Sequence, residues 1–202
     1  MDQNRSTLAT SHSLIDLVQR SDADAWKRLY HVYSPLVLAW ARKAGLRDDR
    51  AADTVQEVFR IVASSIQRFR HDRPQDTFRG WLLTITRNEL RAYFRESARQ
   101  ADLAEGGSAA IDRLYQLPDW VDGNGTADSS LHDASAEQEM MRRAAETVRQ
   151  DFEPHTWQAF WRSVVEEHSP ADIASDLKMT PNAVRQAKFR VLTRLKETIG
   201  DL

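Results

Sequence analysis

The 202-residue chain contains no cysteine, which excludes disulfide bonds and thiolate metal sites and is typical of a reducing compartment. It also lacks long apolar runs. No stretch approaches the roughly 20 apolar residues that a membrane-spanning helix needs, and the first 18 residues hold no apolar run typical of a signal peptide. These absences predict a cytoplasmic protein without a membrane segment.

Recognisable catalytic patterns are missing as well. The six histidines are scattered without metal-ligand spacing, and the seven glycines form no phosphate-binding loop. No serine or carboxylate stands in a known catalytic context. We therefore expect neither an enzyme nor a bound metal or cofactor.

The chain carries almost no net charge, −2 at pH 7, although 29% of its residues are charged. These charges are segregated. Residues 1–100 hold 17 Lys and Arg against 12 Asp and Glu, residues 101–150 hold 4 against 10, and residues 151–202 hold 7 against 8. Any affinity for nucleic acid must then come from local cationic surfaces rather than from the overall charge.

Strand signals are scarce, because apolar residues recur at intervals of three and four instead of alternating. The pattern predicts an all-α protein whose N-terminal helices cover about 14–20, 21–44, 49–69 and 78–95. Ser21 is the expected cap of the second helix and Gly45 its end. Tyr30 and Ala52 are expected on inward faces, and Trp26, Trp157 and Trp161 in the core.

The predicted helices form two domains. The first is an N-terminal helical bundle over residues 11–99. Residues 100–134 are acidic and interrupted by glycines, which predicts a flexible linker. Helical spacing then resumes in a C-terminal domain over residues 135–202.

The segment 78–95, FRGWLLTITRNELRAYFR, has an unusual distribution of side chains around its predicted helix. Apolar residues cover most of the circumference, and an arc of about 100° is polar and cationic. This strip contains Thr84, Arg87, Asn88, Arg91 and Arg95. Because the only acid before Arg95, Glu89, projects away from it, the strip favours an anionic partner such as nucleic acid. A solvated face on which arginines happen to cluster is the alternative.

The C-terminal domain has the spacing of a helix-turn-helix. After a helix that ends near His168, Ser169 and Thr180 each precede a proline and are placed to cap two further helices. From Lys178 to Lys196 there are six basic residues and no acid. Arginine, asparagine and glutamine suit phosphates and base edges in a DNA groove. An ordinary helical hairpin with a basic surface is the alternative.

Three segments taken together point to a family. They are AADTVQEVFRIVA at 51–63, the segment at 78–95, and SPADIASDLKMTPNAVRQAKFRVLTRLKE at 169–197. In this order and spacing the chain resembles the bacterial extracytoplasmic-function sigma factors, the compact two-domain branch of the sigma-70 family. The resemblance covers both predicted domains.

The resemblance implies a transcription initiation factor whose partners are core RNA polymerase and promoter DNA. The clamp coiled coil of the largest polymerase subunit would bind a polar helix face with Asp53, Gln56, Glu57 and Arg60. The loop 68–79 and the helix after it would recognise and open the minus-ten element, with Arg68, Arg70, Arg73, Phe78, Arg79, Trp81, Thr84, Arg87, Asn88, Arg91 and Arg95. The last helix would read the minus-thirty-five element with Thr180, Asn182, Arg185, Gln186, Lys188, Phe189, Arg190 and Arg194. An anti-sigma factor is a further partner that the family suggests, although nothing in the sequence specifies one.

Two departures from the family pattern leave the promoter sequence open. Ala187 stands where many relatives have an arginine, and Phe189 where many have a small or polar residue. Phe189 is unusual on a cationic face and would contact either a protein or a thymine methyl group. From the residues alone, a stand-alone helix-turn-helix regulator that binds duplex DNA as a dimer remains the alternative.

Overall fold

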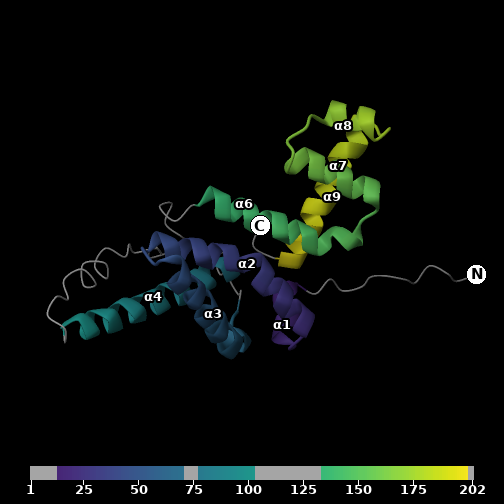
Figure 1. Ribbon diagram of the computed structural model, residues 1–202. Coiled ribbons are helices and arrows are strands. Elements are labelled where there is room, and N and C mark those ends of the chain that lie inside the picture. The colour runs from purple at the N-terminus through teal and green to yellow at the C-terminus, as the bar shows by residue number, and fades with distance from the viewer. Residues whose placement is uncertain (1–12, 71–76, 103–132, 200–202) are drawn as a thin grey trace, which may run out of the picture. The chain divides into compact units, whose positions relative to one another are not determined.

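The structure, a computed structural model, describes residues 13–70, 77–102 and 133–199 (Figure 1). Within these ranges the chain forms helices and no strand, which confirms the predicted all-α fold. The α-helices are α1 (Leu14–Gln19), α2 (Ala23–Lys43), α3 (Asp48–Ser65), α4 (Phe78–Asp102), α6 (Ala134–Val148), α7 (Pro154–Val164), α8 (Pro170–Asp176) and α9 (Pro181–Ile199). Two short 3-10 turns, η1 (Ile66–Arg68) and η3 (Arg149–Asp151), follow α3 and α6.

Local capping explains where the first helices begin and end. Ser13 caps α1 in a reciprocal capping box with Asp16. The cap of α2 is not Ser21, as predicted, because the Asp22 carboxylate accepts the Ala25 backbone N–H at 2.7 Å. Gly45 follows the end of α2 with a φ of +89°, a left-handed conformation that glycine adopts without strain.

The described residues group into two compact units. One combines residues 13–29 with 142–199, and the other comprises residues 30–70, 77–102 and 133–141. Helix α4 continues to Asp102, beyond the predicted end at Arg95. Most of the predicted linker, 103–132, lies outside the described residues.

The core at the start of α4 is aromatic. Phe78, at the start of α4, is 1% exposed and packs edge-on against Tyr33 of α2, with ring centroids 4.8 Å apart. Phe69 follows η1 and contacts both Phe78 and Trp81, at 5.7 and 5.1 Å. These rings hold the start of α4 against Phe69 and η1 at the end of α3, so residues 69 and 78 lie in the same aromatic cluster.

Two predicted inward positions in this unit are wrong. Ala52 is exposed, and α3 instead buries its neighbour Ala51 together with Val58. Tyr30 is 43% exposed, although one edge of its ring contacts Phe59 at 4.8 Å. Among the tryptophans that were predicted to lie in the core, Trp157 is buried, whereas Trp26 and Trp161 are only half-buried.

Helices α7, α8 and α9 pack around a small apolar core in the other unit (Figure 1). Its buried members are small or branched side chains: Ala159, Ile173, Ala174, Val184 and Ala187. Val191 and Leu195 continue the inward stripe of α9 at helical spacing. Burial of this stripe fixes which side of α9 faces outward.

Candidate nucleic-acid interface

The turn between α8 and α9 has the local geometry that the sequence predicts. The Ser169 hydroxyl accepts the Asp172 backbone N–H at 3.2 Å and so caps α8. Lys178 adopts a φ of +52° in the turn, and the Thr180 hydroxyl accepts the Ala183 N–H at 3.1 Å at the start of α9. A short helix, a tight turn and a longer helix thus follow one another in the helix-turn-helix order.

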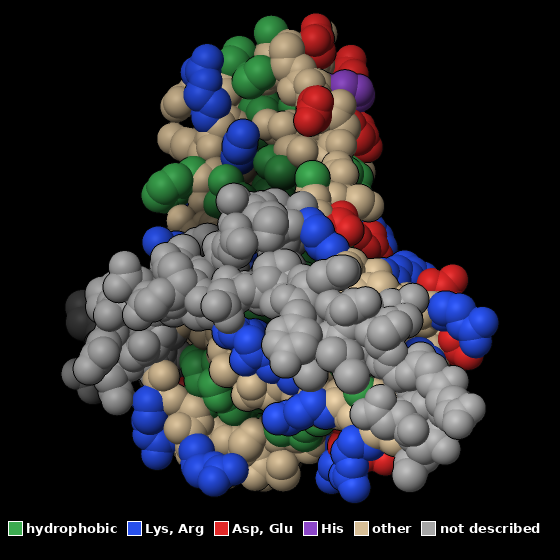
Figure 2. Space-filling view, turned by 90° about the vertical axis from the view of Figure 1, so that its left-hand side faces the viewer, with side chains coloured by type: hydrophobic (Ala, Val, Ile, Leu, Met, Phe, Trp, Pro, Cys, Tyr) green, Lys and Arg blue, Asp and Glu red, His purple; other side chains and the backbone are tan. Residues whose placement is uncertain are grey.

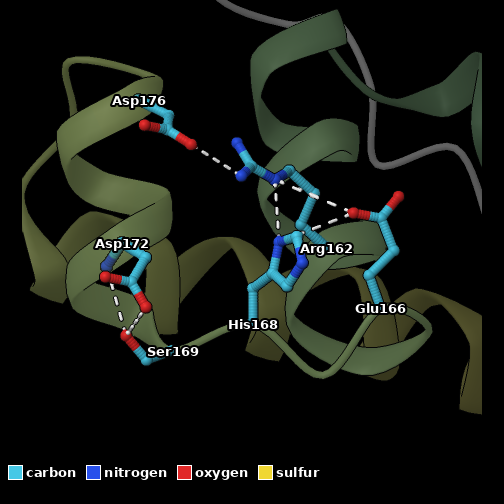
Figure 3. A network of polar contacts seen from close by, with 6 residues as sticks. All are labelled: Arg162, Glu166, His168, Ser169, Asp172 and Asp176. Atoms are coloured by element: carbon cyan, nitrogen blue, oxygen red, sulfur yellow. Dashed lines mark hydrogen bonds and ion pairs between the residues drawn. The ribbon is translucent and has the colours of Figure 1, made fainter.

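A polar network fixes α8 against α7, as Figure 3 shows. Arg162 reaches from α7 to Asp176 at the end of α8, with 2.7 Å between guanidinium nitrogen and carboxylate oxygen. On its other side, its Nε donates to His168 Nδ1 at 3.3 Å and lies 3.8 Å from a carboxylate oxygen of Glu166. Arg162 therefore connects α7, the segment between α7 and α8, and the end of α8.

We expect Arg162→Ala to destabilise the unit that contains α7, α8 and α9 by about 1 kcal/mol, because it removes one side chain from several contacts. Thermal unfolding followed by circular dichroism measures the change. Arg190→Ala, at an exposed position of α9 in the same unit, is the control and should change stability by less than about 0.5 kcal/mol. Equal stability of both variants would contradict a structural role for the network.

The outward face of α9 presents most of the predicted groove-reading side chains. Seven of the eight predicted residues are exposed: Thr180, Asn182, Arg185, Gln186, Lys188, Phe189 and Arg190. Arg194 is half-buried instead and donates to Asp151 at 2.8 Å. In Figure 2, the upper part of the molecule, formed by α7, α8 and α9, carries Lys and Arg side chains on one side and Asp and Glu side chains on the other. Basic and acidic side chains of this unit therefore lie on different sides of the face in view.

The residues of the α4 strip differ in their exposure to solvent. Thr84, Asn88 and Arg95 are exposed, whereas Arg87 and Arg91 are half-buried. Trp81 is half-buried and leans on Phe69. Phe78 departs from its predicted role at a DNA surface, because its ring is buried in the aromatic core and is not presented to a base. Of the predicted aromatic side chains, Trp81 is the one left at the surface.

The arginines around the loop between η1 and α4 differ in their surroundings. Arg68 and Arg70 are exposed after α3, and the Arg70 guanidinium donates to the backbone carbonyls of Gln67 and Phe69, at 2.8 and 3.0 Å. Arg73 lies outside the described residues. Arg79 forms an ion pair with Glu137 of α6, and each of these side chains is only 24% exposed. An acid from a segment 58 residues away thus occupies one predicted DNA contact.

If Arg79 contacts DNA, Glu137 competes with phosphate for its guanidinium. We expect Glu137→Gln to tighten binding of the polymerase-bound protein to promoter DNA about threefold, an effect of ~0.6 kcal/mol that is typical of an ion pair near the surface. A filter-binding titration at constant salt measures it. Glu146→Gln removes an acid that pairs with Arg142 inside α6 and should leave the affinity unchanged. If both variants tighten binding equally, the effect comes from the change in net charge and not from the release of Arg79.

The polar face of α3 contains all four residues predicted to bind polymerase. Asp53, Gln56 and Arg60 are exposed, and Glu57 is half-buried. Two ion pairs run along this face, Arg50 with Asp53 at 3.4 Å and Arg60 with Glu57. Hydrogen bonding to Arg60 lowers the pKa of Glu57, so this carboxylate is ionised at neutral pH.

Glu89 of α4 joins the same face, which the sequence did not indicate. Partial burial is the main cause that raises the pKa of Glu89. The negative charge of Glu57 raises it further, and the positive charge of Arg60 lowers it. Glu57 pairs with Arg60, and Glu89 lies near enough to both for their charges to act on its carboxylate. Such a surface gains electrostatic energy when a further cation approaches.

Residues 29–100, about a third of the chain, match the family model of sigma-70 region 2. The matched segment runs from α2 to α4 and contains the α3 face, the loop and the α4 strip. No curated protein matches the chain.

The match supports the assignment of this chain to the sigma-70 family. It also supports a sigma-factor role in transcription initiation, a non-enzymatic role that involves promoter DNA and the polymerase core. Across the described ranges, no helix is both long enough and apolar enough to cross a membrane.

Proposed function

We propose that this protein is a sigma factor of the extracytoplasmic-function type, which binds core RNA polymerase and directs it to promoters with defined minus-ten and minus-thirty-five elements. One observation carries the proposal. The chain has two cationic helical surfaces, one on α4 inside the segment that matches sigma-70 region 2, and one on the second helix of a helix-turn-helix. A protein that reads two promoter elements needs two such surfaces, and these stand on separate helices.

The α4 surface has the chemistry for opening the minus-ten element. Exposed Asn88 and the arginines of the strip supply hydrogen-bond donors for phosphates and bases, and Trp81 supplies an aromatic ring at the surface. Stacking of a base on an aromatic ring contributes about 1–3 kcal/mol, which is comparable to the cost of unstacking one base. Binding energy can therefore drive local melting, and the proposed mechanism needs no nucleotide hydrolysis.

The remaining surfaces have complementary roles in the proposal. The α3 face with Asp53, Gln56, Glu57 and Arg60 binds the polymerase clamp, and α9 enters the major groove of the minus-thirty-five element. An anti-sigma factor would act by covering the α3 face. This activity belongs to the bacterial cytoplasm, where core polymerase and the chromosome are found.

A gel-shift assay with and without core polymerase tests the proposal against a stand-alone regulator. Because the net charge is only −2, we expect the isolated protein to bind promoter DNA weakly and to gain specific binding only with the core enzyme. Run-off transcription on a promoter library should then yield defined start sites. Tight, sequence-specific binding by the protein alone would favour the stand-alone regulator.

A further inference from the structure

Phe189 is a large apolar side chain that the fold leaves in solvent. It is 71% exposed, the highest value among the large hydrophobic side chains in the described ranges. Tyr30, also exposed, at least rests one ring edge on Phe59. A phenyl ring at position 189 does not stabilise the fold of this unit, because most of its apolar surface stays in contact with water.

The place of Phe189 on α9 is central to the outward face. At about 100° per residue it lies within roughly 40° of Arg185 and 60° of Gln186, and nearly opposite the buried stripe that contains Val184 and Val191. It follows Pro181 by eight residues, about 12 Å along the axis. Base contacts in helix-turn-helix complexes come from the N-terminal part of the second helix. Phe189, the ninth of the 19 residues of α9, lies at the end of the N-terminal half of this helix and on its outward side, within reach of base edges.

The surroundings of the ring favour DNA over a protein groove. Exposed cations flank it at Arg185, Lys188 and Arg190, and no acid occurs between Lys178 and Lys196. An apolar protein groove would have to accept these charges without counterions. A DNA major groove has phosphates along its walls and, at each thymine, one exposed methyl group on its floor. It satisfies the cations and the ring together.

We propose that Phe189 determines promoter specificity by contacting the 5-methyl group of a thymine in the minus-thirty-five element. The inference rests on the proposed function and extends it, because it assigns a base and an atom to this residue. The ring covers the methyl group and excludes water from it, while the flanking cations hold α9 in register on the phosphates. Cytosine, which lacks this methyl group, is thereby disfavoured at that position.

Replacing thymine by uracil removes that methyl group alone and so tests the contact. Core polymerase with the wild-type protein first selects an upstream element from a randomised library. Each thymine of either strand in that element is then replaced by uracil, one at a time, and open-complex formation is titrated. We expect one replacement to weaken the wild-type complex about fourfold, which corresponds to ~0.8 kcal/mol for one buried methyl group.

Variants of Phe189 test whether its ring causes the preference for thymine over uracil. Phe189→Ala should bind the thymine and uracil promoters equally, and Phe189→Leu should retain part of the preference. Lys188→Ala, an exposed neighbour placed to meet phosphate, should weaken both promoters by the same factor and keep the fourfold ratio.

Three results would overturn the inference. The first is an upstream element in which no replacement by uracil weakens binding. The second is a fourfold ratio that persists in Phe189→Ala; an equal loss of affinity for both promoters keeps this ratio and would point to a protein contact. If core polymerase with this protein selects no element at all, the proposed function falls and this inference falls with it, so the two failures are distinguishable.

Discussion

Glu57→Arg is expected to weaken association of the protein with core RNA polymerase about tenfold, or ~1.4 kcal/mol. The reason is electrostatic. On the α3 face, Glu57 and Glu89 lie near one guanidinium, that of Arg60. The surface therefore suits a basic partner, and charge reversal replaces attraction by repulsion at its centre.

The fold should tolerate this change, which allows a clean measurement. The Glu57–Arg60 pair lies on one exposed helix face, where such pairs contribute little to stability. The new guanidinium would also relieve the repulsion by which Glu57 raises the pKa of Glu89. We expect an unchanged thermal midpoint together with the loss of binding in a fluorescence titration with core enzyme.

Glu96→Arg is a matched control for the polymerase measurement. Glu96 pairs with Arg99 at the same i,i+3 spacing on α4, at 3.4 Å, and lies outside the predicted polymerase face. This reversal should leave core affinity within about twofold of the wild type. If both reversals weaken association equally, the α3 face is not the interface and only overall charge matters.

The parts of the protein that could be predicted from sequence are those set by neighbouring residues. The caps at Ser169 and Thr180 each depend on a contact within three residues, and both are present in the structure. The outward side of α9 follows from its apolar spacing, because a helix that buries Val184 and Val191 must expose Phe189. Such features can be predicted without knowing which helices pack against each other.

Other features depend on contacts between distant segments, which helical periodicity does not contain. The pairing of Arg79 with Glu137 spans 58 residues, and that of Arg194 with Asp151 spans 43. The burial of Phe78 and the exposure of Ala52 depend on the packing of α4 and α2 around α3, and a slightly different rotation of one helix would change them. Periodicity identifies a face to within about one residue, so single boundary positions are predicted poorly.

The double variant Arg87→Ala with Asn88→Ala separates promoter opening from polymerase binding. Both positions lie on α4 within the strip, with Asn88 exposed and Arg87 half-buried, and neither belongs to the α3 face. Loss of two polar contacts of about 1 kcal/mol each predicts a roughly 30-fold decrease in open-complex formation. Permanganate reactivity of unpaired thymines measures opening, and the core affinity should stay close to that of the wild type.

A promoter with a mismatched, already opened minus-ten region shows which step the two side chains serve. If they help to unpair the duplex, the mismatch supplies that energy and the variant recovers most of its activity. If they hold the opened strand, the defect persists on the mismatched template. Arg99→Ala with Gln100→Ala removes two exposed side chains further along α4 and should have no effect on either template. A parallel loss of core binding in the first double variant would instead mean that Arg87, whose side chain is half-buried, supports the fold.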